Sequence, residues 1–294
     1  MLLVTGANGQ FAGWVIANLL EMVGPKGFAV CSRSTDSDRA KDLAAKGVSV
    51  REGDFDRPET LPGAMAGIDK VLVIPTYAVN SVRLQQNLNA LEAAKAAGVK
   101  HIIYPSFLGA GPDAMAEHSQ LVHYPTEQAI QASGLTYTIL RHALYADIMV
   151  DDLDETLKRG ALLRAGATGA STYVAREDLG RSAATVMVQD CHENRIYSET
   201  MERSYTGADI AALISEVFEQ PVRFESLSPD AWVEFIHDNW GVPYEIGNST
   251  RGTMRGLENG EFDIVTGDYA AITGAPPRDL RQFLVDLKAK RDAA

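Results

Sequence analysis

Several features that would place this chain in a special class are scarce or missing. Cysteine occurs only twice in 294 residues, so a disulfide framework is excluded. No run of about 18 apolar residues is present, and we expect no membrane span. Basic residues are outnumbered by acidic ones, and the net charge of −12 argues against binding nucleic acid or an anionic membrane through bulk charge. Met1 leads directly into an apolar run without a basic segment, so we expect a cytoplasmic protein.

The first half of the chain alternates short apolar runs with helical patterns. Each run is short enough for a buried strand, and the segments between them repeat apolar residues at helical spacing. This alternation predicts a Rossmann-type α/β fold with a doubly wound parallel sheet. The expected strands cover residues 2–5, 28–31, 48–50, 70–75, 101–104 and 137–141, and the clearest helices cover 81–98, with Ser81 as its cap, and 121–133.

The alternation loosens after Arg141. We therefore expect residues 1–145 to form an NAD(P)-binding domain, whose sheet later segments complete, and residues 146–294 to form a smaller α/β substrate-binding cap. The acidic run at 147–154 is interpreted as a solvated face, and no metal site is expected. Within the second half we expect a strand over 195–198, another over 222–224, and helices that begin near 176, 207, 228 and 277.

A glycine turn follows the first expected strand. Gly6 and Gly9 end the apolar run, and helical spacing starts at Gln10. In a strand, glycine turn and helix arrangement, a nucleotide pyrophosphate binds free backbone N–H groups at the helix N-terminus. Gly6 allows the tight turn, and Gly9 lets the backbone approach the phosphate closely. The spacing is similar to that of short-chain dehydrogenases.

The end of the second expected strand bears on cofactor choice. An acid at this position suits the free ribose of NAD, whereas an arginine suits the 2′-phosphate of NADP. Arg33 therefore favours NADP(H), with Ser32, Ser34 and Arg39 as candidate helpers. The alternative, that Arg33 is a solvated loop residue without a role in cofactor binding, stays open.

Further along the chain, other strand ends carry candidate ligand-binding residues. Asp54 and Phe55 can bind the adenine amine and cover its ring, or they can form a polar turn. Thr76 and Tyr77 should lie beside the cofactor, because ligands bind at the carboxyl ends of the strands in open α/β sheets. Arg83, in the first turn of the next helix, can face the site or solvent.

One expected catalytic residue is missing. Short-chain dehydrogenases pair a tyrosine proton donor with a lysine four residues later, which lowers the tyrosine pKa. Here Tyr124 is followed by Gln128, and a neutral amide cannot stabilise a phenolate by charge. Ordinary carbonyl reduction loses support, which leaves two alternatives. One is hydride transfer to an acceptor that needs little acid help, and the other is nucleotide binding without chemistry.

Taken together, these motifs resemble the NmrA-like branch of atypical short-chain dehydrogenases, and within it the triphenylmethane reductase and NAD(P)H:quinone oxidoreductase group. They span nearly the whole chain. The matching residues are Thr5-Gly-Ala-Asn-Gly-Gln, Arg33, Gly53-Asp54-Phe55, 87–99, His123-x-x-Thr126-Glu127, 133–141, Tyr145 and Thr273-Gly-Ala-Pro-Pro.

The resemblance implies roles for individual residues. It implies that His123 and Tyr124 stand in the catalytic region, although His123 can also be a solvent-facing residue at a helix start. The implied cofactor-binding residues are Gly6, Asn8, Gly9, Gln10, Phe11, Arg33, Asp54, Phe55, Pro75, Thr76 and Ser106. The candidate substrate-binding residues are Tyr77, Phe107 and Tyr145.

The chain also departs from the family pattern near the expected substrate pocket. Pro105 and Phe107 stand where relatives often carry small polar residues. His142-Ala-Leu replaces a run similar to Asn-Gly-Trp before Tyr145. The substrates of relatives therefore do not transfer directly to this chain.

From these features we expect an NADPH-dependent reductase that transfers a hydride to a planar, electron-poor small molecule such as a quinone, dye or enone. The alternative is a non-catalytic NADP(H)-sensing regulator that binds a protein partner. The chain is expected to act as a monomer or homodimer.

Overall fold

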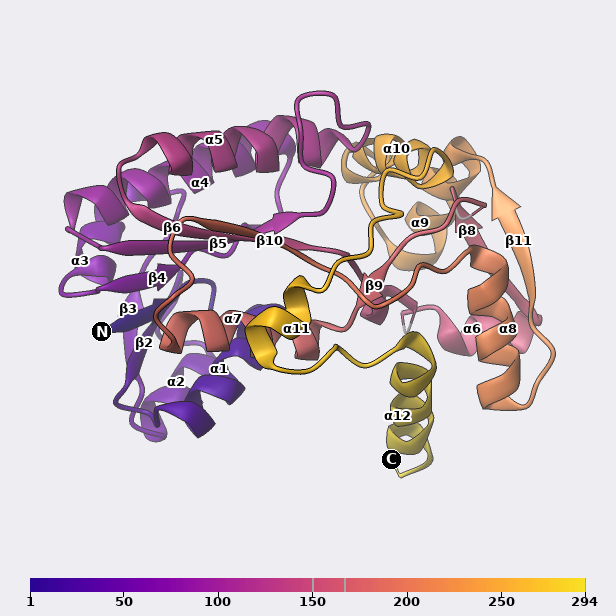
Figure 1. Ribbon diagram of the computed structural model, residues 1–294, viewed down its shortest axis with the longest axis horizontal. Coiled ribbons are helices and arrows are strands. Elements are labelled where there is room, and N and C mark those ends of the chain that lie inside the picture. Colours follow the sequence, from indigo (N-terminus) through magenta and orange to yellow (C-terminus); the bar gives the residue numbers. More distant parts are fainter. Residues whose placement is uncertain (150, 167, 294) are drawn as a thin grey trace.

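A seven-stranded parallel sheet forms the centre of the protein (Figure 1). The computed structural model describes residues 1–149, 151–166 and 168–293. The strand order is β10-β6-β5-β4-β1-β2-β3, and each neighbouring pair runs parallel. The strands are β1 (Leu2–Val4), β2 (Phe28–Ser32), β3 (Ser49–Glu52), β4 (Lys70–Leu72), β5 (His101–Phe107), β6 (Thr136–His142) and β10 (Arg195–Glu199).

Helices cover both faces of this sheet, which confirms the doubly wound prediction (Figure 1). The lower face in the figure carries α1 (Gln10–Met22), α2 (Asp38–Ala45), α7 (Arg176–Val188) and α11 (Asp268–Thr273). The upper face carries α3 (Leu61–Met65), α4 (Asn80–Ala96) and α5 (Tyr124–Ala132). Short helical turns η1 (Pro58–Thr60), η2 (Ser119–His123) and η3 (Ala146–Met149) lie in the connections.

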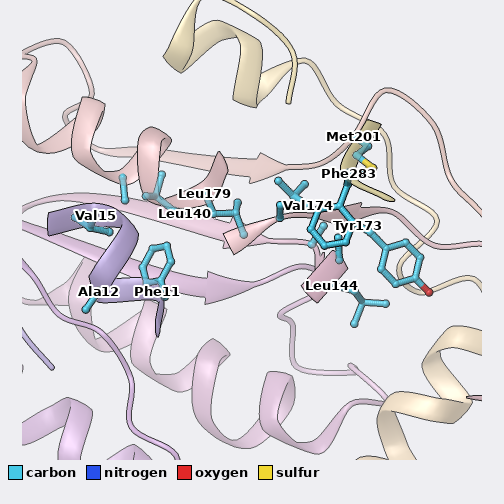
Figure 2. Packing of buried hydrophobic residues seen from close by; sticks show 14 of the residues in the cluster. Phe11, Ala12, Val15, Leu140, Leu144, Tyr173, Val174, Leu179, Met201 and Phe283 are labelled. Carbon is cyan, nitrogen blue, oxygen red and sulfur yellow. The ribbon is translucent and has the colours of Figure 1, made fainter. Parts of the chain in front are cut away.

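The core below the sheet continues into the second half of the chain. Figure 2 shows Phe11 and Val15 of α1 beside Leu140 and Leu179, in the cluster that also includes Phe283 near the C-terminus. Helices α1 and α7 approach closely, since a Cβ on Gly180 would lie 2.4 Å from that of Trp14. Later segments therefore complete both the sheet and its lower layer.

The remaining elements form a smaller α/β part at the right of Figure 1. Two short parallel pairs lie here, β8 with β11 and β7 with β9. The elements are β7 (Leu144–Tyr145), α6 (Leu153–Arg159), β8 (Ala161–Ala165), β9 (Tyr173–Val174), α8 (Gly207–Phe218), β11 (Arg223–Leu227), α9 (Pro229–Trp240), α10 (Tyr244–Glu258) and α12 (Leu280–Asp292). The division at residue 145 stays a prediction.

The predicted helices and strands are found, with some corrections. β4 ends at Leu72, whereas β5 continues to Phe107. Ser81 is not a cap, because α4 begins at Asn80 after Val79. The segment predicted as a helix from 121 begins as the π-helical turn η2. Sequence periodicity missed several elements of the second half, among them α6, β8, α10 and α11.

The prediction of a solvated acidic run is wrong at Asp152. Its carboxylate is buried and accepts a 2.9 Å hydrogen bond from Arg159 Nη2. Asp147, by contrast, is half-buried and accepts a bond from the backbone N–H of Arg176, which starts α7. The Asp147 bond joins this run to α7, whereas Asp151 and Asp154 are exposed as predicted.

Two further features of the described residues bear on function. None of their helices is long and apolar enough to cross a membrane. Among the same residues, no group of three or more histidine, cysteine or acidic side chains could hold a metal ion. Cys31 is buried and Cys191 exposed, and both are free thiols.

Candidate active site

The glycine turn between β1 and α1 has the geometry that an anion site requires. Gly6 has φ +64°, in the left-handed region that favours glycine. Gly9 precedes α1 with extended backbone, and its N–H donates to the Gly6 carbonyl over 2.9 Å. No side chain caps the helix and its first turn carries no acid, so its free N–H groups can bind phosphate oxygens. The residues present therefore fit a dinucleotide.

A cavity of about 540 Å³ lies at this turn, on the edge of the sheet formed by the carboxyl ends of the strands. It gathers eight of the predicted cofactor-binding residues: Gly6, Asn8, Gly9, Arg33, Asp54, Phe55, Pro75 and Thr76. Tyr77, predicted to bind substrate, also lines it and is largely exposed. Four separate loops that follow β1, β2, β3 and β4 supply these residues.

Hydrogen bonds join the glycine turn to the loop after β2. Asn8 Nδ2 donates to Ser32 Oγ over 3.1 Å, and Asn8 Oδ1 accepts from Ser37 Oγ over 3.2 Å. Ser37 also caps α2. The exposed Arg33 side chain is therefore carried on a loop that is fixed against the phosphate turn. Ser32 has this structural role in addition to lining the cavity.

A second set of polar contacts joins α4 to the loops that follow β3 and β4. Gln86 of α4 is buried, accepts from Thr76 Oγ1 and donates to Asp56 Oδ1 over 2.7 Å. Asp54 Oδ2 accepts from Arg57 Nε over 3.2 Å, so its carboxylate is only partly available to an adenine amine. Sequence reasoning missed Gln86, which its position on the inner face of α4 could have indicated.

Three predicted cofactor-binding residues lie outside the lining of this cavity. Gln10 instead lines a separate cavity of about 480 Å³, together with Arg39. Phe11 is buried in the core, with its ring edge on His142 at 5.1 Å. Ser106 is buried and donates to Glu127 Oε1 over 2.5 Å. Their contact with a cofactor stays a prediction.

His123 lies inside the protein, so the solvent-facing interpretation is wrong. Its Nε2 lies 3.2 Å from Arg83 Nη2, and its Nδ1 lies 3.0 Å from Tyr104 Oη. Because a guanidinium only donates hydrogen bonds, Nε2 accepts and Nδ1 carries the proton. Burial and the neighbouring Arg83 charge hold the His123 pKa well below its usual range. The imidazole is therefore neutral at pH 7.

Aromatic rings surround this histidine. Phe107, at the end of β5, lies almost parallel to the His123 ring with centroids 6.2 Å apart. His118 and Phe262 meet Phe107 edge-on at 4.5 and 5.4 Å. Burial lowers the His118 pKa to about 3, so this ring is also neutral at pH 7. This wall of rings is apolar and uncharged, apart from Arg83.

Tyr124 and Gln128 follow at the start of α5. Tyr124 is half-buried, and Gln128 is exposed. No lysine therefore occupies the position that would tune this phenol.

The comparisons with known proteins now decide the family. The model of the NmrA-like family matches residues 1–264. The chain belongs to the NmrA-like family. Quinone oxidoreductase 2 of Escherichia coli (strain K12) is 31% identical over 228 residues, which are 78% of each protein. NAD(P)H azoreductase of Xenophilus azovorans is 26% identical over 291 residues, or 96% of each. The structure of Citrobacter sp. triphenylmethane reductase with NADP(H) superimposes with a TM-score of 0.89, at 32% identity over 98% of this chain and 99% of that one.

In this NmrA-like protein, Tyr145 belongs to a second network of polar side chains. Tyr145 Oη lies 3.3 Å from His142 Nδ1, and His142 Nε2 lies 3.3 Å from Glu199 Oε2. Ser182 donates to the other Glu199 oxygen. The Arg176 guanidinium stacks over the Tyr145 ring at 4.6 Å. Both halves of the chain contribute to this cluster.

The NmrA-like chain holds a further ion pair that sequence reasoning did not find. Glu127 is fully buried and accepts from Arg141 Nε over 2.9 Å and from Nη2 over 2.5 Å. The pair joins α5 to β6, directly behind Ser106. Both residues lie in segments that the resemblance had matched, although their pairing was not predicted.

Proposed function

We propose that this chain transfers a hydride from NADPH to a planar, electron-poor acceptor of the quinone, dye or enone type. The observation that carries the proposal is the aromatic wall of Phe107, His118, His123 and Phe262 around the end of β5, at the same carboxyl-end edge of the sheet as the cofactor cavity. That the chain is an NAD(P)H-dependent oxidoreductase rests on the activities of its relatives, which favour the reductase over the regulatory alternative.

The glycine turn and the loops around it would bind the cofactor. Gly6 and Gly9 would admit the pyrophosphate to the N-terminus of α1, and Arg33 would bind the 2′-phosphate. Phe55 would cover the adenine, while Pro75 would lie along the ribose and nicotinamide. When bound, the nicotinamide supplies the hydride.

The side chains of the aromatic wall would position the acceptor and exclude water. Burial and the neighbouring Arg83 charge lower the pKa of His123, so the neutral ring would not serve as an imidazolium acid at pH 7. It would instead orient Arg83 and form part of the wall. Tyr124 lacks a charged partner, so its contribution to proton transfer would be small.

The decisive experiment is NADPH oxidation with a panel of quinones, azo and triphenylmethane dyes, and enones. Turnover with any of these supports the reductase. Tight NADPH binding without turnover of any compound in the panel would instead support a non-catalytic NADP(H) sensor.

The remaining expectations are part of the same proposal. Its substrate would be a small molecule, and the chain would act in the cytoplasm as a monomer or homodimer. Cell fractionation and light scattering of the purified protein test these two points.

A further inference from the structure

Ordinary packing does not explain the position of Arg83 in the site. It lies in the first turn of α4, one residue after Val82, which lines the cofactor cavity. Four residues earlier, Val79 lines a second cavity of about 570 Å³ below α10. Both cavities include Ala78, so the start of α4 lies where they meet.

The Arg83 side chain is half-buried, and its guanidinium has little of the pairing that a cation in such a position needs. Nη2 donates to the neutral His123, and Nε is buried without a hydrogen-bond partner among the described residues. The ionisable groups near it that its charge affects are the tyrosines Tyr77, Tyr104 and Tyr145 and the histidines His118 and His123. Burial accordingly lowers the Arg83 pKa, although an arginine remains charged.

Other well-packed arginines of the chain show the contrast. Arg141, Arg164 and Arg278 each have a carboxylate oxygen within 4.0 Å. The second cavity does contain acids, but Glu117 and Glu245 are accompanied there by Arg251 and Arg255. A partly buried charge without a counter-ion still costs free energy, and such an arrangement is typical of a group whose partner is a ligand.

We propose that Arg83 binds a carbonyl-type oxygen of the acceptor, and so selects oxygen-bearing acceptors such as quinones and enones over cationic dyes. The inference rests on the proposed function and specifies its substrate class. The fork of a guanidinium suits an oxygen anion, and a preformed donor in a water-poor site is worth most where negative charge develops.

The reaction balances with the groups named. A C–H bond of the reduced nicotinamide breaks, the hydride carries its two electrons into a new bond to the acceptor, and NADPH is oxidised to NADP+. The acceptor's carbonyl π bond breaks, and its electron pair is left on the oxygen that Arg83 faces. A proton from solvent water then completes the reduction. A cationic dye gains only the hydride and develops no oxyanion, so Arg83 would repel it and give it no assistance.

The test compares Arg83→Met with Arg83→Lys, and uses the surface variant Arg281→Met as a control for net charge, since Arg281 is exposed and pairs with Glu216. We expect Arg83→Met to lower kcat/KM for a quinone about 10²- to 10³-fold, and Arg83→Lys to lower it less. Turnover of a cationic triphenylmethane dye should be unchanged or faster, and NADPH affinity unchanged.

Two readouts do not depend on turnover. Arg83→Met should weaken the binding of 4-nitrophenolate, an aromatic oxyanion, and should leave the apo protein at least as heat-stable as the wild type. Equal losses with quinone and dye, or a loss of NADPH affinity, would overturn the assignment. If the wild type reduced neither acceptor, the proposed function itself would fail. Weaker phenolate binding in Arg83→Met would still support Arg83 as an oxyanion site.

Discussion

The buried pair of Glu127 and Arg141 yields a quantitative prediction. The carboxylate accepts three hydrogen bonds, one from Ser106 Oγ at 2.5 Å and two from Arg141 at 2.9 and 2.5 Å. Glu127→Gln keeps the side-chain volume but removes the charge, and it places an NH₂ group among donors. The guanidinium then loses its counter-ion inside the protein.

The expected cost follows from the burial of the pair. Breaking a buried ion pair by removing one partner costs about 3–5 kcal/mol. The Arg141 side chain is 25% exposed and can recover some hydration, so we expect the lower end, about 3 kcal/mol. For a chain of this size each kcal/mol shifts Tm by roughly 2 °C, so Tm should fall by about 6 °C.

Calorimetry of matched variants provides the assay. Glu92→Gln makes the same chemical change at the exposed Glu92–Lys95 pair, where the loss should be below about 1 kcal/mol. Ser106→Ala removes one hydrogen bond and should cost about 1 kcal/mol without a change in NADPH affinity, if its hydroxyl serves only the network. The reasoning is refuted if Glu127→Gln melts no lower than Glu92→Gln.

Further predictions concern the cofactor, the chemistry and pH. NADPH should bind roughly ten- to a hundredfold more tightly than NADH, and Arg33→Ala should remove most of this preference, because a hydrogen bond to a charged group is worth about 1.5–3 kcal/mol; equal affinities in the wild type would contradict it. Gly9→Val should abolish NADPH binding in calorimetric titration while the circular dichroism spectrum is retained, and normal binding would show that the turn is wrongly assigned. On a quinone, His123→Ala should cost more than Tyr124→Phe, because it releases Arg83, and this difference should shrink on a cationic dye; a large Tyr124 effect with a silent His123 would indicate conventional carbonyl reduction. Burial lowers the His118 pKa to about 3 in the folded protein, below its unfolded value. The unfolding free energy should therefore fall by up to about 1.4 kcal/mol per pH unit as the pH drops below about 6.5. Melting curves at several pH values should show a weaker pH dependence for His118→Gln than for the wild type.

The parts of the site that the sequence predicted are those encoded in consecutive residues. The glycine turn, Arg33 and the Asp54–Phe55 pair each follow a strand directly, so the parallel sheet brings them to one edge. Ser106 also follows this pattern, yet its hydroxyl contacts Glu127. The alternation of the strand and the neighbouring helix decide which way a side chain at a strand end points. The position at the strand end alone does not.

The sequence by itself determined the α/β architecture, the glycine turn and the missing lysine after Tyr124, since each is a short-range pattern of residue types. Only the tertiary structure decided the chemistry of the remaining side chains. It brought His123 against Arg83, 40 residues away, and left both rings of the His118–His123 pair neutral. The charge on an imidazole and the pairing of a guanidinium depend on desolvation and on neighbours from other elements, and neither is written in the local sequence.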